Sequence, residues 1–145
     1  MDLYKGLAIG ATTSLTDYPE PSLHLSLKTS SVMHLLSTKD FKVKEFFMDI
    51  LHYAILSHTW EQKEVTYQDV QNLNIMKSKA GFLKVLGACS CVRQYHFDWI
   101  WIDLCCINKE SSTELSEALN SMYQYYEDAA VCYVYLSDIL GAYHP

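Results

Sequence analysis

The stretch "DWIWIDL", residues 98–104, decides the fold of this chain. Side chains alternate between the two faces of a β-strand, so Trp99 and Trp101 point one way and Ile100 and Ile102 point the other. Apolar residues on both faces predict a central strand with helices covering each side of its sheet. Asp103 then follows the apolar run and is expected at the carboxyl end of this strand.

On either side of this strand, three further segments have the composition of β-strands, and three segments have helical patterns. The predicted strands are "VMHLL" (32–36), "YAIL" (53–56) and "VCYVYL" (131–136). One helix is predicted to start at "TYQD" (66–69) and to weaken near Gly81. A second follows, with an apolar stripe at three- and four-residue spacing. That stripe consists of Phe82, Val85, Leu86, Cys89 and Val92.

The third helix is predicted over "SSTELSEALNSMYQYYEDA", residues 111–129. Ser111 and Glu114 match the capping box S-x-x-E, in which each side chain bonds a backbone N–H at the helix start. Its apolar residues are expected to face the core. They are Leu115, Ala118, Leu119, Met122 and Tyr126.

Strands separated by helical segments predict an α/β fold, with a parallel sheet flanked by helices. In open sheets of this type ligands bind beyond the carboxyl ends of the strands. Three predicted strand ends carry polar side chains, and we expect them to line one mouth. These side chains are Ser57 and His58, Asp103, and Ser137 and Asp138.

Length and composition fit one domain, because half of the 145 residues are hydrophobic. Residues 1–31, which include "TDYPEPS", lack periodicity and are predicted to be a poorly ordered leader before a domain at 32–145. The net charge of −6 gives no basic footprint for nucleic acid. No apolar run approaches the ~20 residues that a membrane span requires.

Five cysteines, two of them adjacent, do not form the even framework of a secreted disulfide protein, which favours a reducing, cytoplasmic location. A zinc site would draw on Cys89, Cys91, Cys105, Cys106 and the histidines at 58 and 96. No C-x₂-C pair is present, and adjacent cysteines rarely both bind one ion. No metal site is therefore predicted.

The stretches "YAILSHTW" and "WIWIDLCCINKESSTELSEALNSMYQYYEDAAVCYVYLSD" closely resemble the fungal heterokaryon-incompatibility (HET) domain. The resemblance runs from about Val32 to Asp138. It implies a fungal intracellular module for non-self recognition and regulated cell death, which acts through self-association or with another incompatibility protein. HET domains are distantly similar to Toll/interleukin-receptor (TIR) domains, which implies a flavodoxin-like sheet. Some TIR domains cleave NAD with a glutamate early in a helix, and Glu114 occupies the matching position.

The chain departs from the HET pattern in three places. Glu61 follows the tryptophan of the first block, where the family has glycine, and Ile107-Asn108 replaces an expected Ile-Asp. A third block with Arg-Gly-Trp and Gln-Glu does not occur in the sequence. We therefore expect a domain that is truncated at its C-terminus.

Glu114 has two interpretations. As a catalytic group, its carboxylate would hold the ribose of NAD and stabilise the positive charge of an oxocarbenium-like transition state. As a structural group, it is the N3 member of the capping box and contributes about 1 kcal/mol. The two interpretations are compatible, because a helix start near the carboxyl edge of the sheet would serve both.

The other candidate ligand-binding residues are Ser57, His58, Trp60 and Asp103. Ser57 and His58 would bind a phosphate or sugar, or else form a polar turn, and their adjacency is no sign of a nucleophile–base pair. Asp103 would bind ligand or hold its loop through backbone N–H groups. Trp60, in a loop, is a better stacking candidate than Trp99 or Trp101, which are expected in the core.

Three functions remain open from the sequence. The first is an interaction module of fungal incompatibility. The second is a TIR-like NAD glycohydrolase with no bound cofactor, for which NAD is the substrate. The third is a nonfunctional fragment. The absence of the third block favours the interaction module and the nonfunctional fragment. Glu114 and the polar strand ends keep the NAD glycohydrolase as an open alternative.

Overall fold

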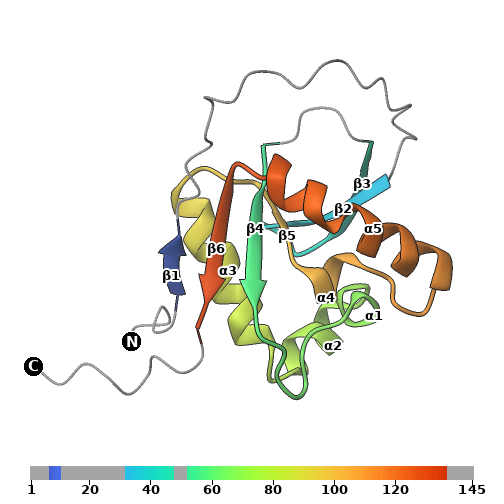
Figure 1. Cartoon of the computed structure of the whole chain (residues 1–145). Helices are drawn as coiled ribbons and strands as arrows, with labels where there is room; N and C mark the ends of the chain where they lie inside the picture. Colours follow the sequence, from blue (N-terminus) through green and yellow to red (C-terminus); the bar gives the residue numbers. More distant parts are fainter. Residues whose placement is uncertain (1–6, 11–31, 48–51, 137–145) are drawn as a thin grey trace, which may run out of the picture.

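Strand β4 (Ala54–His58) forms the centre of the sheet in the computed structural model, which describes residues 7–10, 32–47 and 52–136. Ala54, Ile55 and Leu56 are buried because both faces of this strand are covered. Its two neighbours, β5 (Trp99–Trp101) and β6 (Val131–Tyr135), run parallel to it. The α/β class and the parallel central strands predicted from the sequence are confirmed (Figure 1).

Antiparallel strands extend the sheet on both sides, so the sheet is mixed. Strand β2 (Val32–Ser37) pairs with β5, and β3 (Val43–Phe47) pairs with β2. On the opposite side β1 (Leu7–Gly10) pairs with β6. The order is β1-β6-β4-β5-β2-β3. The sequence analysis predicted no strand at Leu7–Gly10, because a four-residue edge strand carries too little periodicity to stand out.

Helix α3 (Phe82–Gln94) covers one face of the sheet and α5 (Ser112–Asp128) covers the other (Figure 1). On the α5 face the ring of Trp101 lies 5.6 Å from that of Tyr125. The Tyr53 hydroxyl donates to the Tyr125 carbonyl on the same face. On the α3 face the Tyr133 ring lies 6.4 Å from Tyr95, beside the C-terminus of α3. This layering is the one expected from the alternation in "DWIWIDL".

Three short helices lie near the carboxyl end of β4, as Figure 1 shows: α1 (Tyr67–Val70), α2 (Leu73–Ser78) and α4 (Asp103–Cys106). The predicted helix start is confirmed, because Thr66 and Asp69 form a complete capping box. The helix ends at Val70, earlier than expected. Asn72 interrupts it by accepting hydrogen bonds from the N–H groups of Asn74 and Ile75 and starting α2.

The strand predicted over 98–104 is shorter in the structure. It ends at Trp101, and Ile102 is the N-cap of α4, so Asp103 is the first residue of a helical turn rather than the last of a strand. The N–H groups of Cys105 and Cys106 bond back to the Ile102 carbonyl. The turn therefore begins where the chain leaves the sheet, and it fixes the direction of the Asp103 side chain.

Helix α5 is rotated relative to the sequence prediction. Ala118 and Tyr125 are buried, whereas Leu119, predicted to face the core, is 58% exposed. Tyr125 packs against Trp101 and accepts a hydrogen bond from Tyr53, and these contacts set the orientation of the helix. The apolar side chains of α5 are consequently divided between the core and the surface.

Candidate functional site

The carboxyl ends of β4 and β5 bring His58, Trp60 and Asp103 together. The His58 Nε2 atom lies 2.9 Å from Asp103 Oδ1, and Trp60 Nε1 donates to Asp103 Oδ2 at 2.8 Å. The N–H of Leu104 donates to Oδ1 at 2.7 Å. Parallel strands that are neighbours in a sheet end at the same edge, which is why residues 45 positions apart in the chain meet here.

Asp103 is held as a carboxylate by these donors. Burial alone would raise the pKa of its carboxyl group. The hydrogen bonds from His58 and Trp60 outweigh burial, so the pKa of Asp103 lies below its ordinary value. The carboxylate side chain is 17% exposed. It is therefore a mostly buried negative charge whose partners come from the adjacent strand end.

Helix α3 adds a residue that sequence analysis missed, Lys84. Its ammonium forms a short ion pair with Glu64 and donates to the Thr59 carbonyl at 3.3 Å. It also lies 3.4 Å from Nδ1 of His58 and 4.9 Å from the centre of the Tyr135 ring. Lys84 is off the apolar stripe predicted for this helix, and only the packing of α3 on the sheet shows that it is buried.

These contacts form one continuous polar group, called here the His58 cluster, of Trp60, Asp103, His58, Lys84 and Glu64. The His58 Nε2 donates to the Asp103 carboxylate, which carries only acceptors, and the His58 Nδ1 lies between the Lys84 ammonium at 3.4 Å and the Thr59 carbonyl at 3.3 Å. The side chains of His58, Lys84 and Glu64 are only 2%, 5% and 9% exposed. Each charged group of the cluster is therefore hydrogen-bonded inside the protein.

Gly81 makes the approach of α3 to this cluster possible. A Cβ atom at residue 81 would lie 2.9 Å from Glu64 Cα and 3.1 Å from the Lys63 carbonyl oxygen. The Gly81 N–H donates to that same carbonyl at 3.0 Å. Gly81 lies between α2 and α3, as the helix break predicted from the sequence, and it also allows this close contact between backbones.

Ser57 lies outside the His58 cluster, because successive side chains of a strand point to opposite faces. It hydrogen-bonds Tyr126 of α5 on the other face of the sheet. Burial raises the pKa of the Tyr126 hydroxyl, and the hydrogen bond with Ser57 acts in the opposite direction. Two candidates that are adjacent in sequence are thus separated by the sheet itself. The predicted Ser137 and Asp138 lie outside the described residues.

Glu114 belongs to a second polar group, called here the His34 cluster, of His34, Glu45, Asn108 and Glu114. Glu114 Oε1 lies 3.1 Å from His34 Nδ1 and accepts from the Asn108 N–H at 3.2 Å. His34 Nε2 lies 3.3 Å from Glu45 Oε1. Ser111 caps the Glu114 N–H as predicted, but the Glu114 side chain bonds Asn108 and His34. Its described partners do not include Ser57, His58, Trp60 or Asp103.

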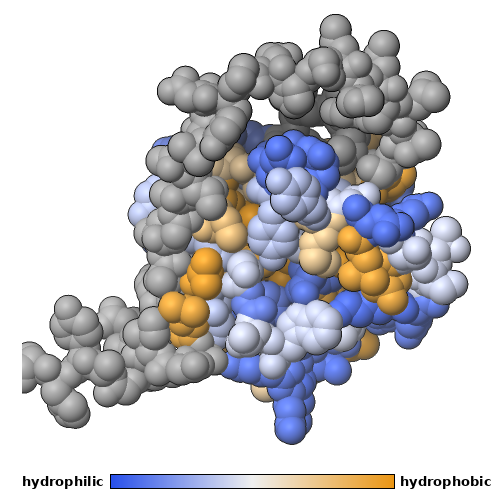
Figure 2. Space-filling model, in the orientation of Figure 1, coloured by the Kyte–Doolittle hydropathy of each residue, from blue (hydrophilic) through white to orange (hydrophobic). Residues whose placement is uncertain are grey.

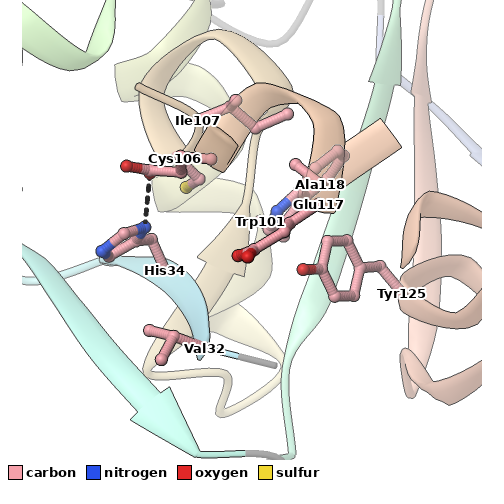
Figure 3. A pocket seen from close by; sticks show the side chains of 9 residues that line it. Val32, His34, Trp101, Cys106, Ile107, Glu117, Ala118 and Tyr125 are labelled. Atoms are coloured by element: carbon pink, nitrogen blue, oxygen red, sulfur yellow. Dashed lines mark ion pairs between the residues drawn. The ribbon is translucent and has the colours of Figure 1, made fainter. Parts of the chain in front are cut away.

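A small cavity lies beside the His34 cluster, between β2 and α5, and Figure 3 shows the side chains around it. His34, Glu114 and Glu117 supply its polar lining, and Trp101, Cys106 and Tyr125 are among the other residues. Its volume of about 20 Å³ is enough for one water molecule. This volume is far smaller than that of a pocket for a nucleotide-sized ligand.

Trp60 is the exposed member of the His58 cluster, at 64%. Its indole nitrogen is bonded to Asp103, and the Lys109 ammonium lies 3.9 Å from the centre of the ring. Cation–π contacts of this kind are favourable at exposed sites. The Lys109 ammonium lies over one face of the ring, and the stacking role expected for Trp60 stays a prediction.

The cysteines are free thiols, and burial raises the pKa of Cys89 and of Cys106 to about 12. Neutral buried thiols pack as small apolar groups.

Within the described ranges, no helix has both the length and the hydropathy to cross a membrane.

Comparison with known proteins identifies the family. The sequence model described as "Heterokaryon incompatibility protein (HET)" matches residues 53–142, which include the whole His58 cluster. The chain is 46% identical over 89 residues to the vegetative incompatibility protein HET-E-1 of Podospora anserina. That alignment covers 60% of this chain and 6% of the relative, so the chain spans a small part of its length. No solved structure matches the chain. The chain belongs to the heterokaryon incompatibility (HET) family.

Proposed function

We propose that this chain is the HET module of a fungal incompatibility response. It acts in the cytoplasm through contacts with a second copy or with another incompatibility protein, and its activation leads to regulated cell death. The relative with 46% identity is a vegetative incompatibility protein, which supports this role. We also propose, from the resemblance of the sequence, that this domain is distantly similar to TIR domains and shares their flavodoxin-like sheet.

The observation that carries the proposal is the closed state of the His58 cluster. Asp103 accepts from His58, Trp60 and the Leu104 N–H, and Lys84 is bonded to Glu64 and the Thr59 carbonyl. A catalytic site needs groups aimed at the place where substrate charge develops. The groups here are aimed at one another, which is typical of a framework that fixes loops for protein contact.

Expression of the chain in a filamentous fungus tests this role. We expect growth arrest or loss of viability with the wild-type chain, and a weaker response with Asp103→Asn, because the loops around Trp60 lose their anchor. Asp98→Asn is the matched control, since Asp98 is an exposed carboxylate paired with Lys39. A host unaffected by a wild-type chain that accumulates and is folded would overturn the proposal.

NAD cleavage by Glu114 is the alternative, and the same structure gives its test. Glu114 and Glu117 both line the cavity beside the His34 cluster, but only Glu114 is bonded to His34 and Asn108. Purified protein is incubated with NAD, and released nicotinamide is measured for wild type, Glu114→Gln and Glu117→Gln. Release that is lost only in Glu114→Gln would support the enzyme. Absence of release in all three supports the interaction module.

A further inference from the structure

Helix α5 presents an apolar stripe to solvent. Leu119 is 58% exposed, Tyr123 79% and Tyr126 37%, and Leu115 and Met122 are half-buried beside them. With 3.6 residues per turn, these five side chains occupy one side of the helix, about a quarter turn from buried Ala118 and Tyr125. They are called here the α5 stripe. Figure 2 shows one hydrophobic patch in the region of α5, bordered by pale and hydrophilic residues.

The borders of the α5 stripe are uncharged along most of its length. Ser112, Ser116 and Asn120 are exposed on its outer side, where a solvated helix face would normally carry charges. Glu117 and Asp128 project from the opposite side of the helix. Glu127, at the C-terminal end, is the only acidic residue of α5 on this border. A second copy of the stripe would therefore meet little repulsion.

We propose that a second copy of this chain covers the α5 stripe, with the two α5 helices packed antiparallel about a two-fold axis between Leu119 and Met122. In this arrangement the stripe is self-complementary, because Leu115 of one copy faces Tyr126 of the other. Glu127 of each copy lies beside the first helical turn, Ser112–Glu114, of its neighbour, where the Glu114 carboxylate is already bonded to His34 and Asn108. The positive end of a helix favours a negative charge there.

The charge pattern favours this orientation over a parallel one. Parallel packing would place the two Glu127 carboxylates together at the negative C-terminal ends of both helices, which is unfavourable. The contact spans about three turns of one helix, which is fewer residues than the roughly 20–30 that each side of a standard interface supplies. The dimer is accordingly weak and transient, and it is favoured by high protein concentration.

This inference rests on the proposed function, because it names the surface through which the HET module associates. Mass in solution is measured against concentration for the whole chain. We expect the mass to rise from monomer towards dimer, and Leu119→Ser/Tyr123→Ser to remain monomeric at the highest concentration. Leu83→Ser/Tyr95→Ser is the control, since these residues are 61% and 51% exposed at α3, and it should associate like wild type.

A second variant tests the antiparallel geometry. Glu127→Lys places a positive charge beside the positive N-terminal end of the partner helix, and the two-fold symmetry makes this happen twice. The variant should weaken the dimer about threefold or more. Asp128→Lys makes the same charge change one residue along, on the other side of the helix, and should leave the dimer unchanged. Equal effects of both variants would overturn the antiparallel arrangement.

The outcomes separate this inference from the function on which it rests. A wild-type chain that is monomeric throughout, or a stripe variant that still dimerises, overturns the inference and leaves the incompatibility role to be judged by the fungal assay. Stripe variants that are monomeric yet still arrest growth show that the dimer exists without being needed for the response, which contradicts its link to the function.

Discussion

The His58 and His34 clusters contain the same kinds of groups but differ in their burial. In each, a histidine bonds a carboxylate that lies far away in sequence. The side chains of His58 and Lys84 are 2% and 5% exposed, whereas those of Glu114 and Glu45 are 29% and 65% exposed. A buried charge that loses its partner costs several kcal/mol, but an exposed one is solvated by water. Stability should therefore depend on the first cluster and little on the second.

The largest effect is expected from Lys84→Ala, which breaks the His58 cluster at its centre. It leaves the Glu64 carboxylate, 9% exposed, without its ammonium partner. We expect the free energy of unfolding to fall by about 3–5 kcal/mol. Urea denaturation measures it. Lys79→Ala is the control, because this lysine is 39% exposed in its pair with Asp69 and should cost less than about 1 kcal/mol.

Asp103→Asn should have the next largest effect, about 2–3 kcal/mol, because it removes the charge that accepts from His58 and Trp60. The pKa of Asp103 is lower in the folded protein than its ordinary value. Its contribution to stability is therefore present above that value, near pH 4, and is lost as the pH falls through the folded pKa.

Denaturation curves recorded from pH 7 to pH 3 check this linkage. The difference in stability between wild type and Asp103→Asn should shrink as the solution becomes acidic. A difference in stability that stays constant over this range would mean that the negative charge of Asp103 does not stabilise the His58 cluster.

Gly81→Ala tests whether backbone contact, rather than charge, positions Lys84. The added Cβ would meet the backbone of Lys63 and Glu64, which must shift, and we expect a loss of about 1–2 kcal/mol. Gly87→Ala, inside the same helix, should instead stabilise the protein by up to about 1 kcal/mol, because alanine is the better helix former. Thermal unfolding of the two variants should move in opposite directions.

The smallest effect is expected from Glu114→Gln in the His34 cluster. This side chain is 29% exposed, and its pair with His34 is partly screened by solvent. The variant should lose about 0.2–1 kcal/mol, measured by the same urea titration. A loss as large as that of Lys84→Ala would erase the contrast between the two clusters.

Much of the fold was predictable because its signals are local. Alternation in "DWIWIDL" predicted a covered central strand, and Thr66 and Ser111 were recognised as helix caps, since a cap needs only residues three apart. The sequence also indicated that polar residues follow β4 and β5. It did not separate Ser57 from His58, although strand alternation applied to the last residues of β4 could have done so.

Sequence alone determined the α/β class and the positions of the parallel central strands. It also placed Ser57, His58, Trp60 and Asp103 in one strand-end region, of which the structure joins His58, Trp60 and Asp103. Tertiary structure alone decided that Lys84 and Glu64 complete the His58 cluster, that Glu114 pairs with His34, and that α5 turns Leu119 and Tyr123 outward. The reason is physical. Periodicity and capping depend on neighbours within a few residues, whereas the rotation of a helix and the partner of a charge depend on surfaces that meet only after folding.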